Sequence, residues 1–357
     1  GRPMPSTIAS EAELRALTGV LGEVGRGVFM MATGSRATPD IMESIAADTG
    51  RPAYISTVLS MYNEAQPDLG LTYYERAAQA LARGHELYIL TSCQPLSFDF
   101  TLLDPYVLLS HSAFDAVKTA QPQDLPAIYA NPDFRRAFRA NLAQPKSGIL
   151  FLGNWAHIEV GQTALAQHQA LEGMRITALA QQRGQDPLDA FFDLALQEQL
   201  QTHFVGKFFQ NQDQGVAPLL KHPASVVTLS DAGAHLSYMC DAGFGLHFLA
   251  HWVRDTAHFT WAEGIRRLTS QPAQRFRIPG RGRLQVGAPA DLLLFDPDTV
   301  GMTKPIPRHD LPAGAQRMIR EPKGVHGGWV NGMQVHNGRE AVPLARGPGH
   351  VLTRFDA

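Results

Sequence analysis

Asp231 holds a position in this sequence that suggests chemistry. It follows the apolar, β-branched run in VVTLSDAGAH, residues 226–235, which predicts a buried strand ending at a carboxylate. An ionised carboxylate at a buried strand end is costly unless something cationic meets it. In a parallel α/β barrel the loops at the carboxyl ends of the strands converge on the catalytic mouth. Asp231 is therefore a candidate catalytic residue, and the structural alternative is a turn cap completed by Ser230 and Gly233.

His235 and the residues that follow a second strand are the other candidates. His235 lies four residues beyond Asp231, where it would orient that carboxylate, contact a substrate or tie down the loop. The run ELYILTS predicts another strand, which ends at Ser92, so Ser92, Cys93 and Gln94 would line the same mouth. The predicted substrate-binding residues are thus His235, Ser92, Cys93 and Gln94.

Alternating strands and helices must position these residues. Apolar runs without polar alternation are typical of parallel strands covered on both faces by helices. Between residues 93 and 160 the pattern does not fix the order of the elements. The predicted strands are 27–33, 53–59, 86–92 and the run before Asp231; the predicted helices are 10–23, 38–48, 71–83, 125–141, two short ones within 174–200, 213–222, 242–254 and 260–276.

The residue pattern changes after Phe276, from helical periodicity to short apolar runs separated by glycine and proline. Asn331 and Gly332 separate two short apolar runs, and Asn-Gly is the strongest signal for a two-residue hairpin turn. We therefore predict two units, residues 1–279 with the alternating pattern and residues 280–357 as a small β domain.

Composition excludes some classes of function. The chain has 357 residues, 18% of them charged, with a formal net charge of -2 and no long run of one sign, so nothing indicates nucleic-acid or membrane-surface binding. No apolar stretch approaches the length of a membrane span, and the first twenty residues lack a signal-peptide pattern. Two cysteines provide no disulfide framework, which fits a reducing compartment, and we expect a cytoplasmic protein.

Several segments together resemble one known family. They are SDAGAH (230–235), WAEGIRRLTSQPAQRF (261–276), GRGRLQVGAPADLLLFD (280–296), GVHGGWVNGMQVHNG (324–338), GQDPLDAFFDLALQEQLQTHF (184–204) and the opening GRPMPSTIASEAEL (1–14). In combination they resemble the C-terminal portion of the amidohydrolase superfamily, and within it the N-acyl-D-amino-acid deacylase (D-aminoacylase) branch. This resemblance implies the second half of a distorted (β/α)8 TIM barrel plus a small C-terminal β-sandwich domain.

The resemblance also implies a reaction. Asp231 maps onto the family's metal-facing carboxylate, which takes a proton from a metal-bound water, and one or two zinc ions would keep it charged. The expected activity is metal-dependent hydrolysis of the amide bond of a small N-acyl amino acid. Cys93 as a metal ligand is a weaker alternative, because the family's cysteine ligand belongs to the half that this sequence lacks.

The family's His-x-His pair has no counterpart in this chain, and no histidine follows the first two predicted strands. A zinc site needs three or more protein ligands, so we expect most ligands outside this chain, on an N-terminal fragment or subunit that carries the His-x-His half. The chain would then be one piece of a nicked or split enzyme. The alternatives are a non-catalytic binding or regulatory subunit, or another enzyme of the superfamily, of cyclic-amidase or lactonase type. A homo-oligomer is compatible with each.

Overall fold

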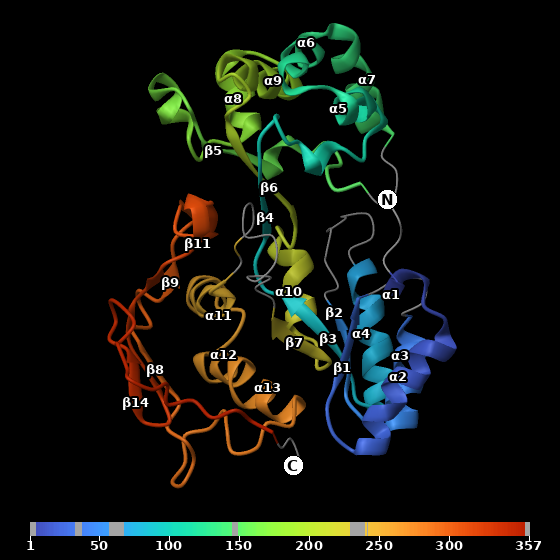
Figure 1. Ribbon diagram of the computed structural model, residues 1–357, viewed down its shortest axis with the longest axis vertical. Coiled ribbons are helices and arrows are strands. Elements are labelled where there is room, and N and C mark those ends of the chain that lie inside the picture. The colour runs from blue at the N-terminus through green and yellow to red at the C-terminus, as the bar shows by residue number, and fades with distance from the viewer. Residues whose placement is uncertain are drawn as a thin grey trace.

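The computed structural model describes residues 5–32, 38–56, 68–144, 149–228, 240 and 242–353. Figure 1 shows three parts: a parallel sheet with its helices, a helical unit above it, and a layer of C-terminal strands beside them. Its helices are α1 (Pro5–Ile8), α2 (Glu11–Val24), α3 (Pro39–Thr49), α4 (Thr72–Ala82), α5 (Asp115–Thr119), α6 (Leu125–Ala130), α7 (Pro132–Ala143), α8 (Ile176–Arg183), α9 (Pro187–Gln197), α10 (Asp213–Lys221), α11 (Phe244–His247), a π-helix (Phe248–Asp255), α12 (Trp261–Leu268) and α13 (Ser270–Arg275).

The parallel sheet contains the four strands that the apolar runs predict. They are β1 (Phe29–Ala32), β2 (Ala53–Ser56), β3 (Leu87–Ser92) and β7 (Ser225–Thr228), in the order β1-β2-β3-β7, with every neighbouring pair parallel. Their carboxyl ends therefore meet at one edge of the sheet. In the described residues β1 and β7 are the edge strands of an open sheet, so this part of the chain shows a mixed α/β fold with a four-stranded parallel sheet.

A chain of buried hydroxyl groups ties this sheet to the helix beside it. The Tyr74 hydroxyl of α4 lies 2.8 Å from Thr91 Oγ1 in β3, which in turn lies 2.7 Å from Ser225 Oγ in β7. All three side chains are buried. Buried hydroxyls are costly unless they are paired, so this chain sets the positions of β3 and β7 relative to each other.

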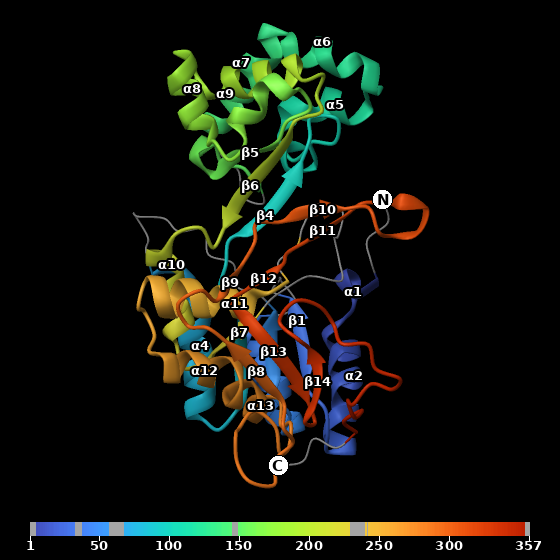
Figure 2. The same cartoon turned by 90° about the vertical axis from the view of Figure 1, so that its left-hand side faces the viewer.

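Between β3 and β7 the chain leaves the parallel sheet and forms a separate unit, residues 96–209. Its antiparallel sheet has the order β4-β6-β5 and consists of β4 (Leu96–Phe100), β5 (Ile158–Gln162) and β6 (His203–Phe209). Figure 2 shows β4 and β6 running from the parallel sheet up to the helices α5–α9. An aromatic core that includes Phe138, Phe191, Phe192 and Phe204 holds these helices on the strands.

Two predicted helices are each interrupted, and in both cases a proline explains the break. The helix predicted over 125–141 is two helices, because Pro132 begins α7 and Asn131 caps it by accepting a hydrogen bond from Asp133 N. The helix predicted over 260–276 divides at Thr269, because Pro272 lies in the first turn of α13 and has no N–H to continue the ladder from α12.

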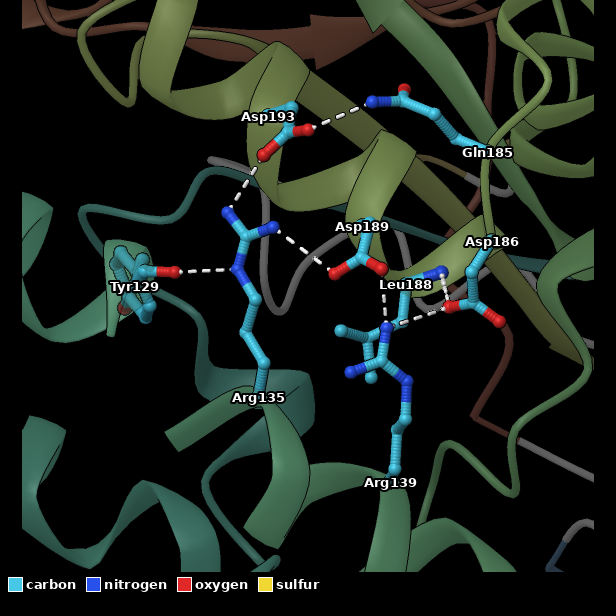
Figure 3. Close-up of polar contacts among 8 residues, drawn as sticks. All are labelled: Tyr129, Arg135, Arg139, Gln185, Asp186, Leu188, Asp189 and Asp193. Carbon is cyan, nitrogen blue, oxygen red and sulfur yellow. Dashed lines mark hydrogen bonds and ion pairs between the residues drawn. The ribbon is translucent and has the colours of Figure 1, made fainter. Parts of the chain in front are cut away.

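Arg135 on α7 joins α7 to α9 in the helical unit (Figure 3). Its Nη1 lies 3.1 Å from Asp189 Oδ1 and its Nη2 lies 2.8 Å from Asp193 Oδ1, while Nε donates to the Tyr129 carbonyl at 2.9 Å. The side chain is 13% exposed, and its guanidinium also stands 5.5 Å from the Phe192 ring centre. All three nitrogens of this guanidinium therefore have hydrogen-bond partners, and the side chain is largely shielded from water.

The start of α9 is held by the neighbouring charges. Asp186 precedes Pro187 and caps the helix by accepting from Leu188 N at 3.0 Å, an arrangement typical of a helix start, and it also pairs with Arg139. Arg139 reaches Asp189 Oδ2 at 2.5 Å, so two arginines of α7 share this aspartate (Figure 3).

The C-terminal residues form short antiparallel sheets. The strands are β8 (Leu292–Phe295), β9 (Gly301–Met302), β10 (Ile306–Arg308), β11 (Arg317–Ile319), β12 (Pro322–Lys323), β13 (Val325–Val330) and β14 (Met333–His336). The predicted hairpin is confirmed, since Asn331 and Gly332 adopt φ values of 48° and 81° between β13 and β14. The order of the largest of these sheets is β14-β13-β8, and Leu293 and Leu294 of the edge strand β8 are 51% and 53% exposed. Successive residues face opposite sides of a strand, so both faces of β8 present apolar surface to solvent.

The helices of the described residues are all too short or too polar to cross a bilayer.

We predict that Arg135→Met lowers the free energy of unfolding by about 3 kcal/mol, because it leaves the partly buried Asp193 without its cation and leaves Asp189 with Arg139 alone. Urea denaturation followed by circular dichroism measures this loss. The matched control is the neighbouring Arg136→Met, since Arg136 and its partner Asp133 are 74% and 79% exposed, and we expect a change below about 0.5 kcal/mol there. Equal effects of the two substitutions would contradict a special role for Arg135.

Candidate functional site

A cavity of about 820 Å³ lies at the carboxyl end of β3. The polar face of the β4-β6-β5 sheet forms one wall, and the loop that follows β5 forms another. The segment from β9 to β11 and His247 at the end of α11 complete it. The cavity therefore lies at the edge of the parallel sheet where α/β proteins place their binding sites.

The residues after β3 join the parallel sheet to the β4-β6-β5 sheet. Ser92 Oγ donates to the Gln94 carbonyl at 3.1 Å, and β4 begins at Leu96. Gln210, just beyond β6, donates from Nε2 to the Ser92 carbonyl at 2.8 Å. The chain thus leaves the parallel sheet after Ser92 and comes back to the same point at Gln210. This arrangement holds the β4-β6-β5 sheet over the end of β3.

The structure places the three predicted residues of this segment differently. Gln94 lines the cavity. Ser92 and Cys93 are buried, and neither is among the described residues that line it. The Cys93 thiol donates to the Phe244 carbonyl at 3.4 Å and the Cys93 carbonyl accepts from Trp252 Nε1 at 2.6 Å. The contacts of Cys93 join β3 to α11 and the π-helix.

Asp231 and His235 lie outside the described residues. The strand that precedes them, β7, is described to its end at Thr228 and pairs directly with β3, Ser92 opposite Thr228. Asp231 follows Thr228 by three residues in the sequence.

Two ion pairs stand on the cavity face of the β4-β6-β5 sheet. His203 Nδ1 lies 2.7 Å from Asp99 Oδ1, and Lys207 Nζ lies 2.8 Å from Glu159 Oε1. His203, Val205 and Lys207 lie at alternate positions of β6 and line the cavity, whereas Phe204 and Phe208, on the opposite face of the strand, belong to the aromatic core. Asp99 raises the pKa of His203 by hydrogen bonding and charge, against the opposing effect of burial.

Sequence reasoning missed these four charged residues. In HFVGKFF, residues 203–209, His203 and Lys207 are separated by an even number of positions, and Phe204 and Phe208 occupy the positions between these two sets. This period of two is the signal of a half-buried strand, and it places His203 and Lys207 on one face.

Glu198 holds the loop that forms the second wall. Its side chain is fully buried and accepts hydrogen bonds from the backbone N–H groups of Ala164 and Leu165 and from His168 Nδ1, the last at 2.6 Å. Ala164 and Leu165 line the cavity. A buried carboxylate with three donors sets the path of this loop.

The described residues do not form a metal site, because they contain no cluster of three or more histidine, cysteine or acidic side chains able to hold an ion.

We predict that Glu198→Gln releases the cavity loop, because the amide cannot accept from all three donors. Deuterium uptake of residues 163–171 should rise, and the free energy of unfolding should fall by about 2 kcal/mol. Hydrogen-exchange mass spectrometry locates the change. Glu340→Gln, on the surface of the C-terminal unit, is the control and should leave both quantities unaltered. Unchanged uptake in the Glu198 variant would show that the loop is held by other contacts.

The His203–Asp99 pair predicts a pH dependence of stability. Because the folded pKa of His203 is raised, the pair stabilises the fold below about pH 6.5, and this stabilisation is lost as the pH rises through the raised value. Asp99→Asn should therefore destabilise the protein most at low pH within the range where Asp99 is ionised, with a smaller difference at pH 8 and above. Thermal melts across pH measure it, with Asp104→Asn as the control. A difference that grows with pH would contradict the assignment.

Comparisons with known proteins agree with this architecture. The D-aminoacylase of Alcaligenes xylosoxydans xylosoxydans is 34% identical over 109 residues, which are 30% of this chain and 20% of that sequence. An uncharacterized protein of Mycobacterium tuberculosis is 30% identical over 181 residues, 48% of this chain and 28% of that one. The chain therefore matches less than a third of the length of either relative.

Solved structures of deacylases share the fold. A D-aminoacylase crystal structure superimposes with a TM-score of 0.53 at 18% identity, over 96% of this chain and 59% of that chain. The N-acyl-D-glutamate deacylase from Bordetella bronchiseptica, solved with zinc and a phosphonate mimic of the tetrahedral intermediate, gives 0.50 at 20% identity, over 93% and 57%. The model of the amidohydrolase family matches residues 7–336. With nearly the whole sequence matched, this chain belongs to the amidohydrolase family.

Proposed function

We propose that this chain is the second half of the barrel of a metal-dependent amide hydrolase that acts on N-acyl-D-amino acids. The cavity at the carboxyl end of β3 carries this proposal, because it is lined by paired charges and because β3 pairs with β7, the strand that precedes Asp231. Family membership and the likeness to deacylase structures support amide hydrolysis as the reaction.

The metal ligands are proposed to come mainly from outside this sequence. Zinc would supply positive charge for the attacking water and the acyl oxygen, but the described residues do not provide its site. Two features support a polypeptide segment that completes the fold. Among the described residues, no further strand pairs with β1 or β7 at the edges of the parallel sheet, and β8 exposes leucines on both faces. Open apolar edges of this kind are normally paired or covered.

The groups of this chain have defined tasks in the proposed reaction. Asp231 accepts a proton from the attacking water and passes it to the leaving amine, so that the tetrahedral intermediate collapses to acid and amine. The cavity face of the β4-β6-β5 sheet binds the substrate, and the loop held by Glu198 shields it from solvent.

We predict that Asp231→Asn abolishes hydrolysis of N-acetyl-D-amino acids, with at least a thousandfold loss of kcat, because the amide cannot accept the proton. The thermal midpoint should change little. Asp291→Asn is the control, since Asp291 accepts from Asn331 N and pairs with Arg281 in the C-terminal unit. Activity that survives the Asp231 substitution would refute the catalytic assignment.

The proposed companion segment is tested by mass spectrometry of active material. We expect a polypeptide carrying a His-x-His sequence, either continuous with this chain or bound to it, together with one or two zinc ions. Active material that contains only the 39.0 kDa chain would contradict the companion, and a complex that is pure, zinc-free and inactive would favour a binding or regulatory subunit.

A further inference from the structure

Lys304 brings a positive charge to the cavity from the C-terminal strands. It lies between β9 and β10, lines the cavity and has an exposed side chain. Its ammonium lies beside a second wall, the loop that follows β5, because a Cβ atom built on Gly173 would lie 3.5 Å from Lys304 Nζ. The ammonium of Lys304 therefore stands between two walls of the cavity, where a ligand can reach it.

Hydrogen bonds fix the backbone on both sides of Lys304. Thr303 N donates to the Glu321 carbonyl at 2.9 Å, and Thr303 Oγ1 accepts from Glu321 N at 2.9 Å. Two residues beyond Lys304, Ile306 pairs with Ile319 in the antiparallel β10-β11 sheet. The backbone of Lys304 is thus held in place, while its flexible four-carbon side chain can turn its ammonium toward a ligand.

The ammonium of Lys304 has no hydrogen bond or ion pair with any of the described residues. Glu172, the neighbour of Gly173 in the sequence, is the nearest acidic residue along this loop. Its Oε1 atom accepts from Thr163 N and from Thr163 Oγ1, both at 2.9 Å. A lysine ammonium has three donors and no acceptor, so all three donors of Lys304 are available to a ligand in the cavity.

The charges on the β4-β6-β5 sheet also favour an anionic ligand. In the pair of His203 with Asp99 the side chains are 32% and 13% exposed, and in the pair of Lys207 with Glu159 they are 33% and 18% exposed. The basic member of each pair is therefore more accessible from the cavity than its carboxylate. A ligand group that offers acceptor atoms and a negative charge suits such a wall, and a carboxylate offers both.

We propose that Lys304 binds the carboxylate of the N-acyl amino acid, which makes Lys304 a specificity-determining residue for anionic substrates. The inference rests on the proposed function, because an N-acyl amino acid presents a carboxylate close to its amide bond. A hydrogen bond between an ammonium and a carboxylate is about twice as strong as one between neutral groups. A neutral substrate of the same shape should therefore bind less tightly.

The test compares two probes, N-acetyl-D-alanine and the neutral N-acetyl-D-alaninamide. Binding is measured by calorimetry on the protein in the assembly in which it is isolated, with the Asp231→Asn variant used to prevent turnover. We expect the carboxylate probe to bind about tenfold more tightly, and in a Lys304→Met background this preference should fall to about one. Lys323→Met is the matched control, because Lys323 on β12 is exposed and is not among the described residues that line the cavity. The control should keep the preference of the parent protein.

A second measurement detects the contact directly. Saturating N-acetyl-D-alanine should slow the acetylation of Lys304 by sulfo-N-hydroxysuccinimide acetate, because the bound carboxylate covers the ammonium, and it should leave the acetylation of Lys323 unchanged. Mass spectrometry of the digested protein measures both rates.

Three results would overturn the inference while leaving amide hydrolysis intact. They are equal affinity of the two probes for the protein with Lys304 intact, a preference that survives Lys304→Met, and bound N-acetyl-D-alanine that does not protect Lys304. Failure of both probes to bind would instead remove the proposed function, and the inference with it.

Discussion

The direct continuation of β3 into β4 is the constraint on which the rest of the structure depends. Only three residues separate the two strands, and Gln210 ties the returning chain to the Ser92 carbonyl. The parallel sheet and the β4-β6-β5 sheet are therefore joined at a short, hydrogen-bonded junction. This junction places the polar face of the second sheet over the carboxyl end of the first, and the cavity is the space that results.

Buried polar contacts hold the end of β3 and the loop after β5, which border the cavity. The hydroxyl groups of Tyr74, Thr91 and Ser225 position β3 relative to β7. Glu198 holds the loop after β5 through its hydrogen bonds to that loop. In the unit formed by residues 96–209, Arg135 and Arg139 of α7 join this helix to α9 (Figure 3). Buried charges and hydroxyls lose much of their favourable energy if one partner moves, so these contacts keep the cavity in one shape.

The elements of the parallel sheet could be predicted from sequence, and the cavity could not. Buried parallel strands such as Leu87–Ser92 appear as continuous apolar runs. Ser10 and Asp186 cap α2 and α9 by accepting from backbone N–H groups two or three positions on, and Asn331-Gly332 makes a two-residue turn, so local pattern suffices for them. The cavity residues come from separate parts of the chain. His203 and Asp99 are 104 positions apart, and Glu198 meets its partners about 30 positions away. Their chemistry arises from tertiary pairing, which no local spacing encodes. Of the residues predicted for the strand end after β3, only Gln94 lines the cavity, because the Ser92 hydroxyl is used within the junction and the Cys93 thiol contacts α11.

The central claim is that the cavity at the end of β3 is where the substrate binds. Hydrogen-exchange mass spectrometry of the Asp231→Asn variant, with and without saturating N-acetyl-D-alanine, tests it most directly. The account predicts that added ligand slows exchange in residues 94–99, 159–172 and 203–207, which line the cavity from three parts of the sequence, and leaves the β13–β14 hairpin unchanged. Protection confined to other segments, or none in these three at saturation, would contradict it.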